Sequence, residues 1–262
     1  MGDYLSDEDE GDFADWLIGM EDTPGFGNCN ECKYFRAGSP TICSTCASQT
    51  LKTPQHPCPV CGQDLKSSAA SCTNRLCVAP NRQFDRIHAI GMKTGALQRA
   101  ILAYKDDQRW GWGVIFGRVL LGFLRANPAL AQKFDMIIPM PAFLGPDQTR
   151  QMHDLAAWMI ESAIKEDEDD LPFLLAPRVI VKRYATPKMR TTAGVAERRR
   201  LALQIRAALD VPEPALVAGQ KIAVVDDVFT GGHTLNVVAE ALREGGARSV
   251  SGIVIARQPW RT

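Results

Sequence analysis

The sequence lacks any hydrophobic segment long enough to cross a membrane. Its longest strongly apolar run, Val119 to Leu124, is far shorter than the roughly 20 residues that a membrane-spanning helix needs. The N-terminus also lacks the basic and apolar regions of a signal peptide. We therefore expect neither secretion nor a membrane span, and these absences favour a cytoplasmic protein.

The chain also lacks an excess of charge of either sign. Its 262 residues include 30 basic and 30 acidic side chains, so the formal net charge is zero. This balance does not favour a protein that binds nucleic acid mainly through electrostatics, although local basic patches remain. Hydrophobic residues make up 45% and charged residues 23%, which is typical of a globular protein. The length suits one medium domain with a smaller appendage, or two small domains.

Basic residues are absent from the first 28 positions, which carry nine acidic residues. Such a segment cannot bury enough apolar surface to offset the entropy lost on ordering. We therefore expect an acidic, disordered tail over residues 1–28. Phe13, Trp16, Leu17 and Ile18 interrupt the acids, so a short helix that docks on a partner is the alternative.

Cysteine is absent after Cys77, and all eight cysteines lie within residues 29–77. They form three Cys-x-x-Cys pairs and a fourth pair with four residues between. Two thiolates separated by two residues can bind one cation across a tight turn, and four complete a tetrahedral zinc shell. A disulfide framework would need an oxidising compartment, and no export signal is present. We predict two structural zinc ions in a zinc-ribbon module over residues 29–80, with the ligands Cys29, Cys32, Cys43, Cys46, Cys58, Cys61, Cys72 and Cys77.

The spacing leaves the pairing of these cysteines open. Tandem sites would group the first four and the last four, whereas an interleaved cross-brace would join the first pair to the third. The wider spacing of Cys72 and Cys77 weakens the last half-site, and His56 is an alternative ligand, although a loop role suits it better. Because four-thiolate sites keep no open coordination position, we expect them to stabilise the fold rather than to catalyse.

Helical and strand patterns alternate beyond residue 80. Strands are predicted at residues 134–139, 178–181, 221–225 and 249–256, and helices at 96–124 with a break near 111–113, at 149–164 and at 235–244. Strands that alternate with helices indicate a parallel sheet flanked by helices. We predict an α/β fold for this domain, which spans residues 81–262.

The most specific motif runs from Ala223 to Leu235 and reads AVVDDVFTGGHTL. In a parallel sheet, ligands bind at the loops that follow the C-terminal ends of the strands. The glycine-rich loop and the start of the next helix can bind a phosphate. The adjacent carboxylates Asp226 and Asp227 can bind a sugar diol, directly or through Mg²⁺. Phosphate and diol together describe a ribose 5-phosphate, and the alternative is a strand–turn–helix connection with an Asp-Asp cap.

This run resembles the signature of type I phosphoribosyltransferases, which use phosphoribosyl pyrophosphate. Four further features make the resemblance more specific: the Cys-x-x-Cys pairs, the segment Phe84-Asp85-Arg86, the segment from Gly95 to Lys105, and the run Ile138-Pro139-Met140-Pro141. Their order along the chain resembles that of the ComF-type phosphoribosyltransferases, a bacterial family associated with natural competence. The resemblance implies a pentosyl transfer, in which pyrophosphate leaves C1 of the ribose as an acceptor enters from the other face.

The resemblance also implies roles for individual residues. Asp226 and Asp227 would hold the ribose and its Mg²⁺, Thr230 to Thr234 would bind the 5-phosphate, and the loop from Met140 toward Arg150 would face the pyrophosphate. A basic stretch over residues 178–206 would supply further cations. We assign catalytic roles to Asp226, Asp227, Lys105 and Arg183. Ligand-binding roles go to Val228, Phe229, Thr230, Gly231, Gly232, His233, Thr234, Pro139, Met140, Pro141, Arg150 and Lys188.

The sequence departs from the family pattern at Gln151-Met152, Met189 and Gly231, which leaves the acceptor and turnover open. The alternative function is a protein that handles single-stranded DNA or works with DNA-uptake or recombination proteins, and binds phosphoribosyl pyrophosphate as a regulator without turnover. Trp110 and Trp112 would then stack on bases. Packing of these tryptophans between the sheet and a helix is the simpler interpretation.

Overall fold

The structure is a computed structural model that describes residues 29, 44–65, 67–148, 150–187 and 195–260. Several predictions made from the sequence concern residues outside these ranges. They concern the acidic segment 1–28, the zinc ligands Cys32 and Cys43, and Lys188.

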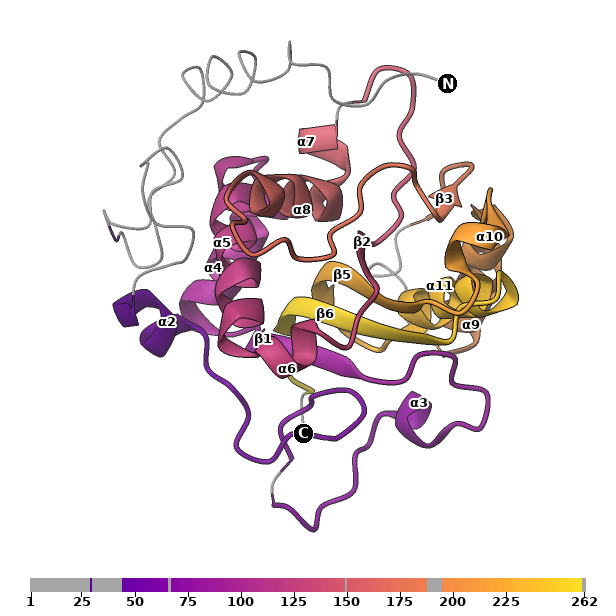
Figure 1. Ribbon diagram of the computed structural model, residues 1–262. Coiled ribbons are helices and arrows are strands. Elements are labelled where there is room, and N and C mark those ends of the chain that lie inside the picture. The colour runs from indigo at the N-terminus through magenta and orange to yellow at the C-terminus, as the bar shows by residue number, and fades with distance from the viewer. Residues whose placement is uncertain (1–28, 30–43, 66, 149, 188–194, 261–262) are drawn as a thin grey trace.

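Four parallel strands form the central sheet, in the order β1-β6-β5-β2 (Figure 1). Their bounds are β1 Ile87–Met92, β2 Met136–Pro139, β5 Lys221–Phe229 and β6 Ser249–Arg257. The two central strands are buried along most of their length, which explains their nearly continuous apolar sequence. The predicted α/β fold with a parallel sheet is confirmed.

Helices cover both faces of the sheet (Figure 1). On one face lie α4 (Gly95–Lys105), α5 (Gly111–Ala126) and α8 (Leu155–Lys165), which share one apolar core with the sheet. On the other lie α9 (Val195–Ala208), α10 (Pro214–Val217) and α11 (His233–Glu244), which share a second core. The remaining short helices are α2 (Ser44–Thr50), α3 (Arg75–Val78), α6 (Pro128–Ala131) and α7 (Arg150–His153).

Glycine at the start of α5 allows α8 to approach closely. A Cβ atom added to Gly113 would lie 2.2 Å from Cδ1 of Trp158, whose Nε1 donates a hydrogen bond to the carbonyl of Trp110 at 2.9 Å. Trp112 is buried and packs against Phe116, with ring centroids 5.8 Å apart. These contacts agree with the packing interpretation of the Trp-Gly-Trp motif.

Three predicted elements differ from the structure. Residues 178–181 do not join the parallel sheet, because residues 172–174 hydrogen-bond to Ile137 along the outer edge of β2. Instead β3 (Val181–Lys182) pairs with β4 (Leu209–Asp210) in a separate antiparallel ribbon. The helix predicted at 149–164 is divided into α7 and α8 by Asp154, whose side chain caps α8. The edge strand β1 was not predicted.

No helix in the described part of the chain is both long and apolar enough to span a membrane.

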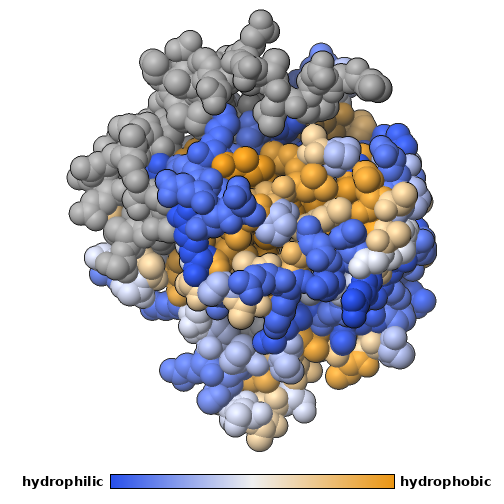
Figure 2. Space-filling view, viewed as in Figure 1, coloured by the Kyte–Doolittle hydropathy of each residue, from blue (hydrophilic) through white to orange (hydrophobic). Residues whose placement is uncertain are grey.

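On the face seen in Figure 1, apolar residues gather near the centre and hydrophilic residues border them (Figure 2). Cys58 and Cys61 share a buried cluster with Phe84 and Ile87, so the cysteine-containing loops and the sheet have one continuous core.

Candidate functional site

A pocket of about 180 Å³ lies beside β5 and just beyond the C-terminal end of β2. This is the edge at which parallel sheets bind ligands. Five elements contribute to it: the end of α4, the segment after β2, the end of α7, the start of α8, and β5. The lining residues are Lys105, Met140, Pro141, Ala142, His153, Asp154, Leu155, Ala156, Asp226 and Asp227.

The acidic pair belongs to β5, which continues through both residues to Phe229. Asp227 is 3% exposed, and its backbone N–H donates a hydrogen bond to Oδ1 of Asp226 at 2.9 Å. Burial, and then the neighbouring Asp227 carboxylate, raise the pKa of Asp226 to about 8. The pair therefore favours a cation or a hydrogen-bond donor that would stabilise its second negative charge.

Lys105, the last residue of α4, supplies part of this compensation. Its Nζ lies 2.7 Å from Oδ1 and 2.5 Å from Oδ2 of Asp227. The Lys105 side chain is 31% exposed, so it connects the buried carboxylate to the open side of the pocket.

The loop from Thr230 to Thr234 follows the acidic pair and leads into α11. Gly232 has a φ of +90°, and a Cβ atom there would lie 2.6 Å from the Phe229 ring, so glycine is required on both counts. The N-cap residue of α11 is Gly232, which has no side chain to cap the helix. The unsatisfied N–H groups and the positive end of the helix dipole therefore suit an anion such as a phosphate.

The structure brings together five of the residues singled out from the sequence. Asp226, Asp227, Lys105, Met140 and Pro141 all line the pocket. Their chemical roles remain predictions.

Other predicted site residues do not line the pocket. Arg183 is exposed and pairs with Asp210, and Arg150 pairs with Glu161 at 2.7 Å. Pro139 is buried in β2. Lys188 lies outside the described residues.

The Phe229 side chain points into the core, and the assignment of this residue to ligand binding stays a prediction. This ring is 4% exposed and packs edge-on against Phe84, with centroids 5.9 Å apart. Val228 is half-buried and packs against the opposite core. Adjacent side chains of a strand point to opposite faces of the sheet, and because helices cover both faces, each of these two side chains meets a core.

Sequence reasoning missed part of the pocket wall. Asp154 is 2% exposed, accepts a hydrogen bond from the N–H of Ala157 and pairs with Arg178 at 2.9 Å. Burial raises its pKa, and Arg178 opposes this shift. His153, the last residue of α7, also lines the pocket. An aspartate directly before an apolar helix is a capping signal that marks this break.

Residues 178–262 match the family model of the phosphoribosyl transferase domain. Within this phosphoribosyl transferase domain lie β5, α11 and β6, and with them the acidic pair and the loop from Thr230 to Thr234. Lys105, Met140 and His153 precede the matched residues and complete the pocket from outside them. No curated protein matched the chain.

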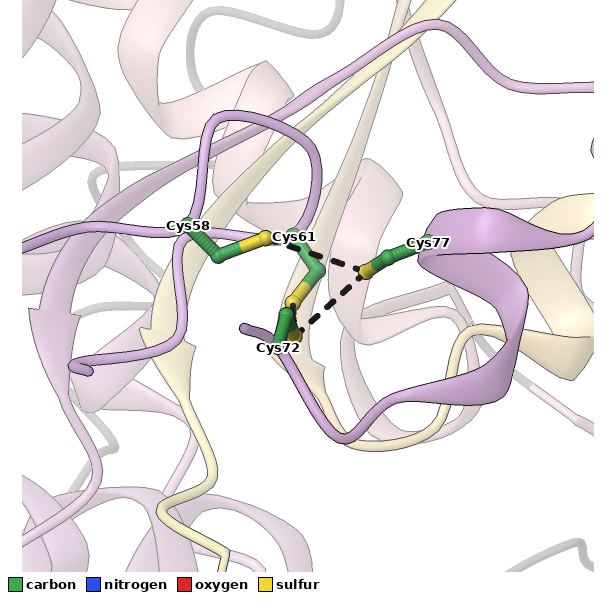
Figure 3. A group of neighbouring side chains, drawn as sticks. All are labelled: Cys58, Cys61, Cys72 and Cys77. Carbon is green, nitrogen blue, oxygen red and sulfur yellow. Dashed lines mark hydrogen bonds between the residues drawn. The ribbon is translucent and has the colours of Figure 1, made fainter. Parts of the chain in front are cut away.

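Four cysteines, none of which lines the pocket, form a candidate metal site (Figure 3). The Sγ–Sγ distances are 3.8 Å for Cys58–Cys77, 3.6 Å for Cys61–Cys72 and 3.7 Å for Cys72–Cys77. A tetrahedron with Zn–S bonds of about 2.3 Å has edges of about 3.8 Å, so the four sulfurs fit a zinc ion. Burial, and then the Cys61 thiolate, help raise the pKa of Cys72 to about 11, a penalty that a bound cation would remove.

This grouping agrees with the tandem arrangement for the last four cysteines. His56 is exposed and takes no part in the cluster. Cys29 and Cys46 pack with the apolar core near α4. Because Cys32 and Cys43 lie outside the described residues, the first zinc site remains a prediction.

Proposed function

We propose that the protein is a ComF-type phosphoribosyltransferase, which binds phosphoribosyl pyrophosphate with Mg²⁺ in this pocket and transfers the phosphoribosyl group to an acceptor. One observation carries the proposal. A pair of acids, of which Asp227 is buried and Asp226 half-buried, lines a pocket, and two residues later the chain enters a glycine loop and the start of α11, within a segment that matches the phosphoribosyl transferase domain.

Each part of the site has a chemical task in this reaction. Asp226 and Asp227 accept hydrogen bonds from the ribose hydroxyls and offer the oxygen ligands that Mg²⁺ prefers. Bound Mg²⁺ would compensate charge on the pyrophosphate and ribose oxygens. The amides and hydroxyls of Thr230 to Thr234 bind the 5-phosphate. The bond from C1 to the pyrophosphate oxygen breaks, and the electron pair leaves with the pyrophosphate while the acceptor bonds to C1.

Lys105 has a separate task. Its ammonium group pairs with the Asp227 carboxylate in the ligand-free protein and keeps that side chain at the pocket, where it can meet the ribose and its metal. Because the Lys105 side chain also faces the open side of the pocket, it can move toward a phosphate oxygen when Mg²⁺ takes over the charge of Asp227. Apolar atoms of Met140, Pro141 and Leu155 line the rest of the pocket and suit a flat, weakly polar acceptor.

Calorimetric titration with phosphoribosyl pyrophosphate, with and without Mg²⁺, tests the proposal. We expect Mg²⁺-dependent binding to the wild type, weakened about 10- to 100-fold by Asp226→Asn or Asp227→Asn, as for the loss of charged hydrogen bonds. Asp107→Asn, an exposed acid between α4 and α5, is the matched control and should bind normally. Equal affinity in all four proteins would overturn the proposal.

Turnover is tested separately from binding. Pyrophosphate release against a panel of purine and pyrimidine bases identifies an enzyme and its acceptor class. Tight binding without release for any base favours the regulatory alternative instead. In that case, binding of single-stranded DNA should weaken steeply as salt increases.

A further inference from the structure

Arg257, at the end of β6, lies between the four-cysteine cluster and the loop that follows β5. It is fully buried. On one side its Nε donates to the carbonyl of Cys61 at 3.1 Å, and an Nη lies 3.8 Å from the Cys61 sulfur. On the other side Nη1 donates to the carbonyl of Phe229 at 3.2 Å, and the guanidinium lies 5.1 Å from the centre of the Phe229 ring. One side chain therefore touches a zinc ligand and the residue directly before Thr230.

The charge of Arg257 needs a partner. Within the described part of the chain, its polar contacts are backbone carbonyls and the Cys61 sulfur, and none is a carboxylate. A buried guanidinium without a counter-charge is strongly unfavourable. Two positive charges of Zn²⁺ against four thiolates leave a net negative charge on the cluster. A metal-loaded cluster would therefore supply the counter-charge for Arg257.

Asn74 makes a second, independent connection. It lies between Cys72 and Cys77 and is 3% exposed. Its Oδ1 accepts a hydrogen bond from the N–H of Leu76 and so caps α3, while its Nδ2 donates to the carbonyl of Gly231 at 3.4 Å. The loop from Thr230 to Thr234 thus accepts a hydrogen bond from a residue of the cysteine module.

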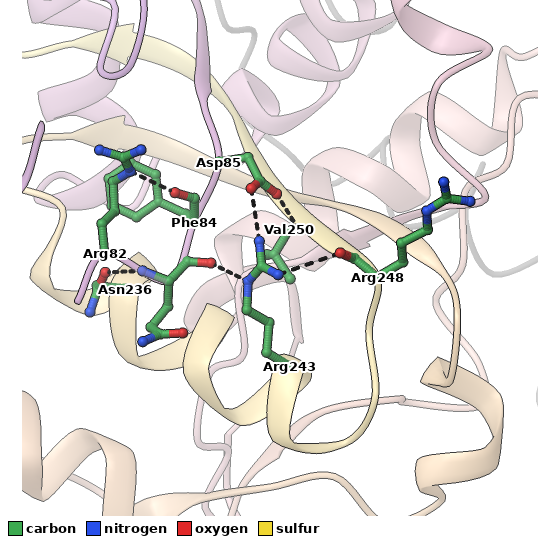
Figure 4. A network of polar contacts seen from close by, with 8 residues as sticks. Arg82, Phe84, Asp85, Asn236, Arg243, Arg248 and Val250 are labelled. Carbon is green, nitrogen blue, oxygen red and sulfur yellow. Dashed lines mark hydrogen bonds and ion pairs between the residues drawn. The ribbon is translucent and has the colours of Figure 1, made fainter. Parts of the chain in front are cut away.

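A third connection fixes α11 itself (Figure 4). Arg82 donates to the carbonyl of Cys77 at 2.5 Å, and the next residue, Gln83, donates its N–H to the side chain of Asn236 at 2.9 Å. Arg243, near the other end of α11, donates to the carbonyl of Gln83 at 2.5 Å and pairs with Asp85 at 2.8 Å. Residues 82–85, which follow the cysteine cluster, are therefore hydrogen-bonded to α11, the helix that follows the loop from Thr230 to Thr234.

We propose that the metal-loaded cluster of Cys58, Cys61, Cys72 and Cys77 positions the loop from Thr230 to Thr234 for phosphate binding, with Arg257 and Asn74 as the positioning residues. This inference rests on the proposed function for its ligand. Coupling between two sites is reciprocal, so zinc must raise the affinity for phosphoribosyl pyrophosphate by the same factor by which that ligand raises the affinity for zinc. A factor of about 5 or more is the usual size of such a coupling.

Hydrogen exchange of the full chain tests the coupling without any phosphate ligand. We expect zinc to slow exchange at the amides of residues 230–236, relative to protein stripped with a chelator. In zinc-loaded Asn74→Ser these amides should exchange about fivefold faster than in the wild type, as for one hydrogen bond of ordinary net strength. Serine retains a cap for α3 but is too short to reach Gly231. Asn81→Ser, the same substitution at an exposed position directly after the cysteine module, is the matched control and should match the wild type.

Amides of α5 report whether the stripped chain is still folded. If exchange at residues 230–236 is the same with and without zinc while α5 stays protected, the coupling is overturned. Equal rates in Asn74→Ser and Asn81→Ser, both zinc-loaded, would exclude Asn74 as a positioning residue.

Titration of the same proteins with phosphoribosyl pyrophosphate distinguishes this inference from the proposed function. Weaker binding after zinc removal, with a smaller loss in Asn74→Ser, supports both. Equal affinity for phosphoribosyl pyrophosphate with and without zinc contradicts the inference and leaves the proposed function standing. If zinc-loaded wild type does not bind the ligand but zinc still protects the loop, the proposed function fails and the structural coupling stands.

Discussion

The Lys105 ammonium group lies within 2.7 Å of both carboxylate oxygens of Asp227, although the two residues are 122 positions apart in the sequence. Asp227 is almost fully buried, and Lys105 closes one side of the pocket over it. A buried carboxylate is costly without a partner for its charge, and Lys105 is that partner for Asp227. The Lys105–Asp227 ion pair therefore contributes both to the stability of the protein and to the shape of the ligand-free pocket.

Lys105→Met should destabilise the protein by about 2 kcal/mol. This is less than the loss of one partner from a fully buried pair, because Lys105 is 31% exposed. Urea unfolding at pH 7 measures the change, with the exposed Lys52→Met as the control. In the double variant Lys105→Met/Asp227→Asn the loss should be smaller than the sum of the single losses. Additive effects would contradict a direct interaction.

Asp226→Asn should stabilise the ligand-free protein while it weakens ligand binding. The substitution removes a carboxyl group whose ionisation is disfavoured by burial and by Asp227, and asparagine can still accept the hydrogen bond from the N–H of Asp227. We expect a rise in unfolding temperature of about 2–4 °C, which corresponds to about 1 kcal/mol for a chain of this size. Calorimetry or circular dichroism measures it. A lower unfolding temperature than for Asp107→Asn would show that the acid serves stability instead.

His88, on the edge strand β1, should make the fold sensitive to mild acid. Burial, and then the charges of Arg86 and Lys133, lower its pKa from 6.5 to about 4. Between these two values the unfolded chain binds more protons than the folded chain, so stability falls as the pH falls from 6.5 toward 4. The contribution cannot exceed about 1.4 kcal/mol per pH unit.

His88→Gln tests this prediction because glutamine does not titrate. Its free energy of unfolding should depend less on pH between 4 and 6.5 than that of the wild type. The exposed His56→Gln serves as control and should keep the wild-type profile. Parallel profiles for wild type and His88→Gln would show that another group causes the acid sensitivity.

The cluster of Cys58, Cys61, Cys72 and Cys77 should bind one zinc ion per chain, and the first four cysteines should account for a second. Metal analysis of the purified full chain measures the total. We expect Cys61→Ser to lose one zinc ion and to unfold at a lower temperature, because metal binding supplies folding energy to these loops. If Cys61→Ser retained the full metal content, the four sulfurs would not form the site.

The main strands could be predicted because a buried strand consists mostly of apolar residues. Strands β5 and β6 are covered on both faces and are therefore apolar over most of their length. Strand β1 reads IHAIGM, where His88 and Gly91 interrupt both the apolar run and the alternation, so no local pattern marked it. Residues 179–181 are apolar because Val179 and Ile180 enter the core, not because they extend the sheet.

The candidate site was only partly predictable. The motif from Ala223 to Leu235 placed the acids and the loop, because strand, carboxylates and glycines are contiguous in the chain. Asp154 and the Asn74–Gly231 contact depend on chain segments that meet only in the folded protein. The family pattern also assigned Arg183 to the site, and the structure instead pairs it with Asp210 on the β3–β4 ribbon.

The central claim is that Asp226, Asp227 and the following loop hold phosphoribosyl pyrophosphate. Its most direct test is a crystal structure grown with this ligand and Mn²⁺ in place of Mg²⁺, with the metal located by anomalous scattering. We predict an anomalous peak next to the ribose hydroxyls at the Asp226–Asp227 pair and the 5-phosphate against the amides of Thr230 to Thr234. Ligand and metal bound elsewhere on the chain, with this pocket filled only by water, would contradict the account.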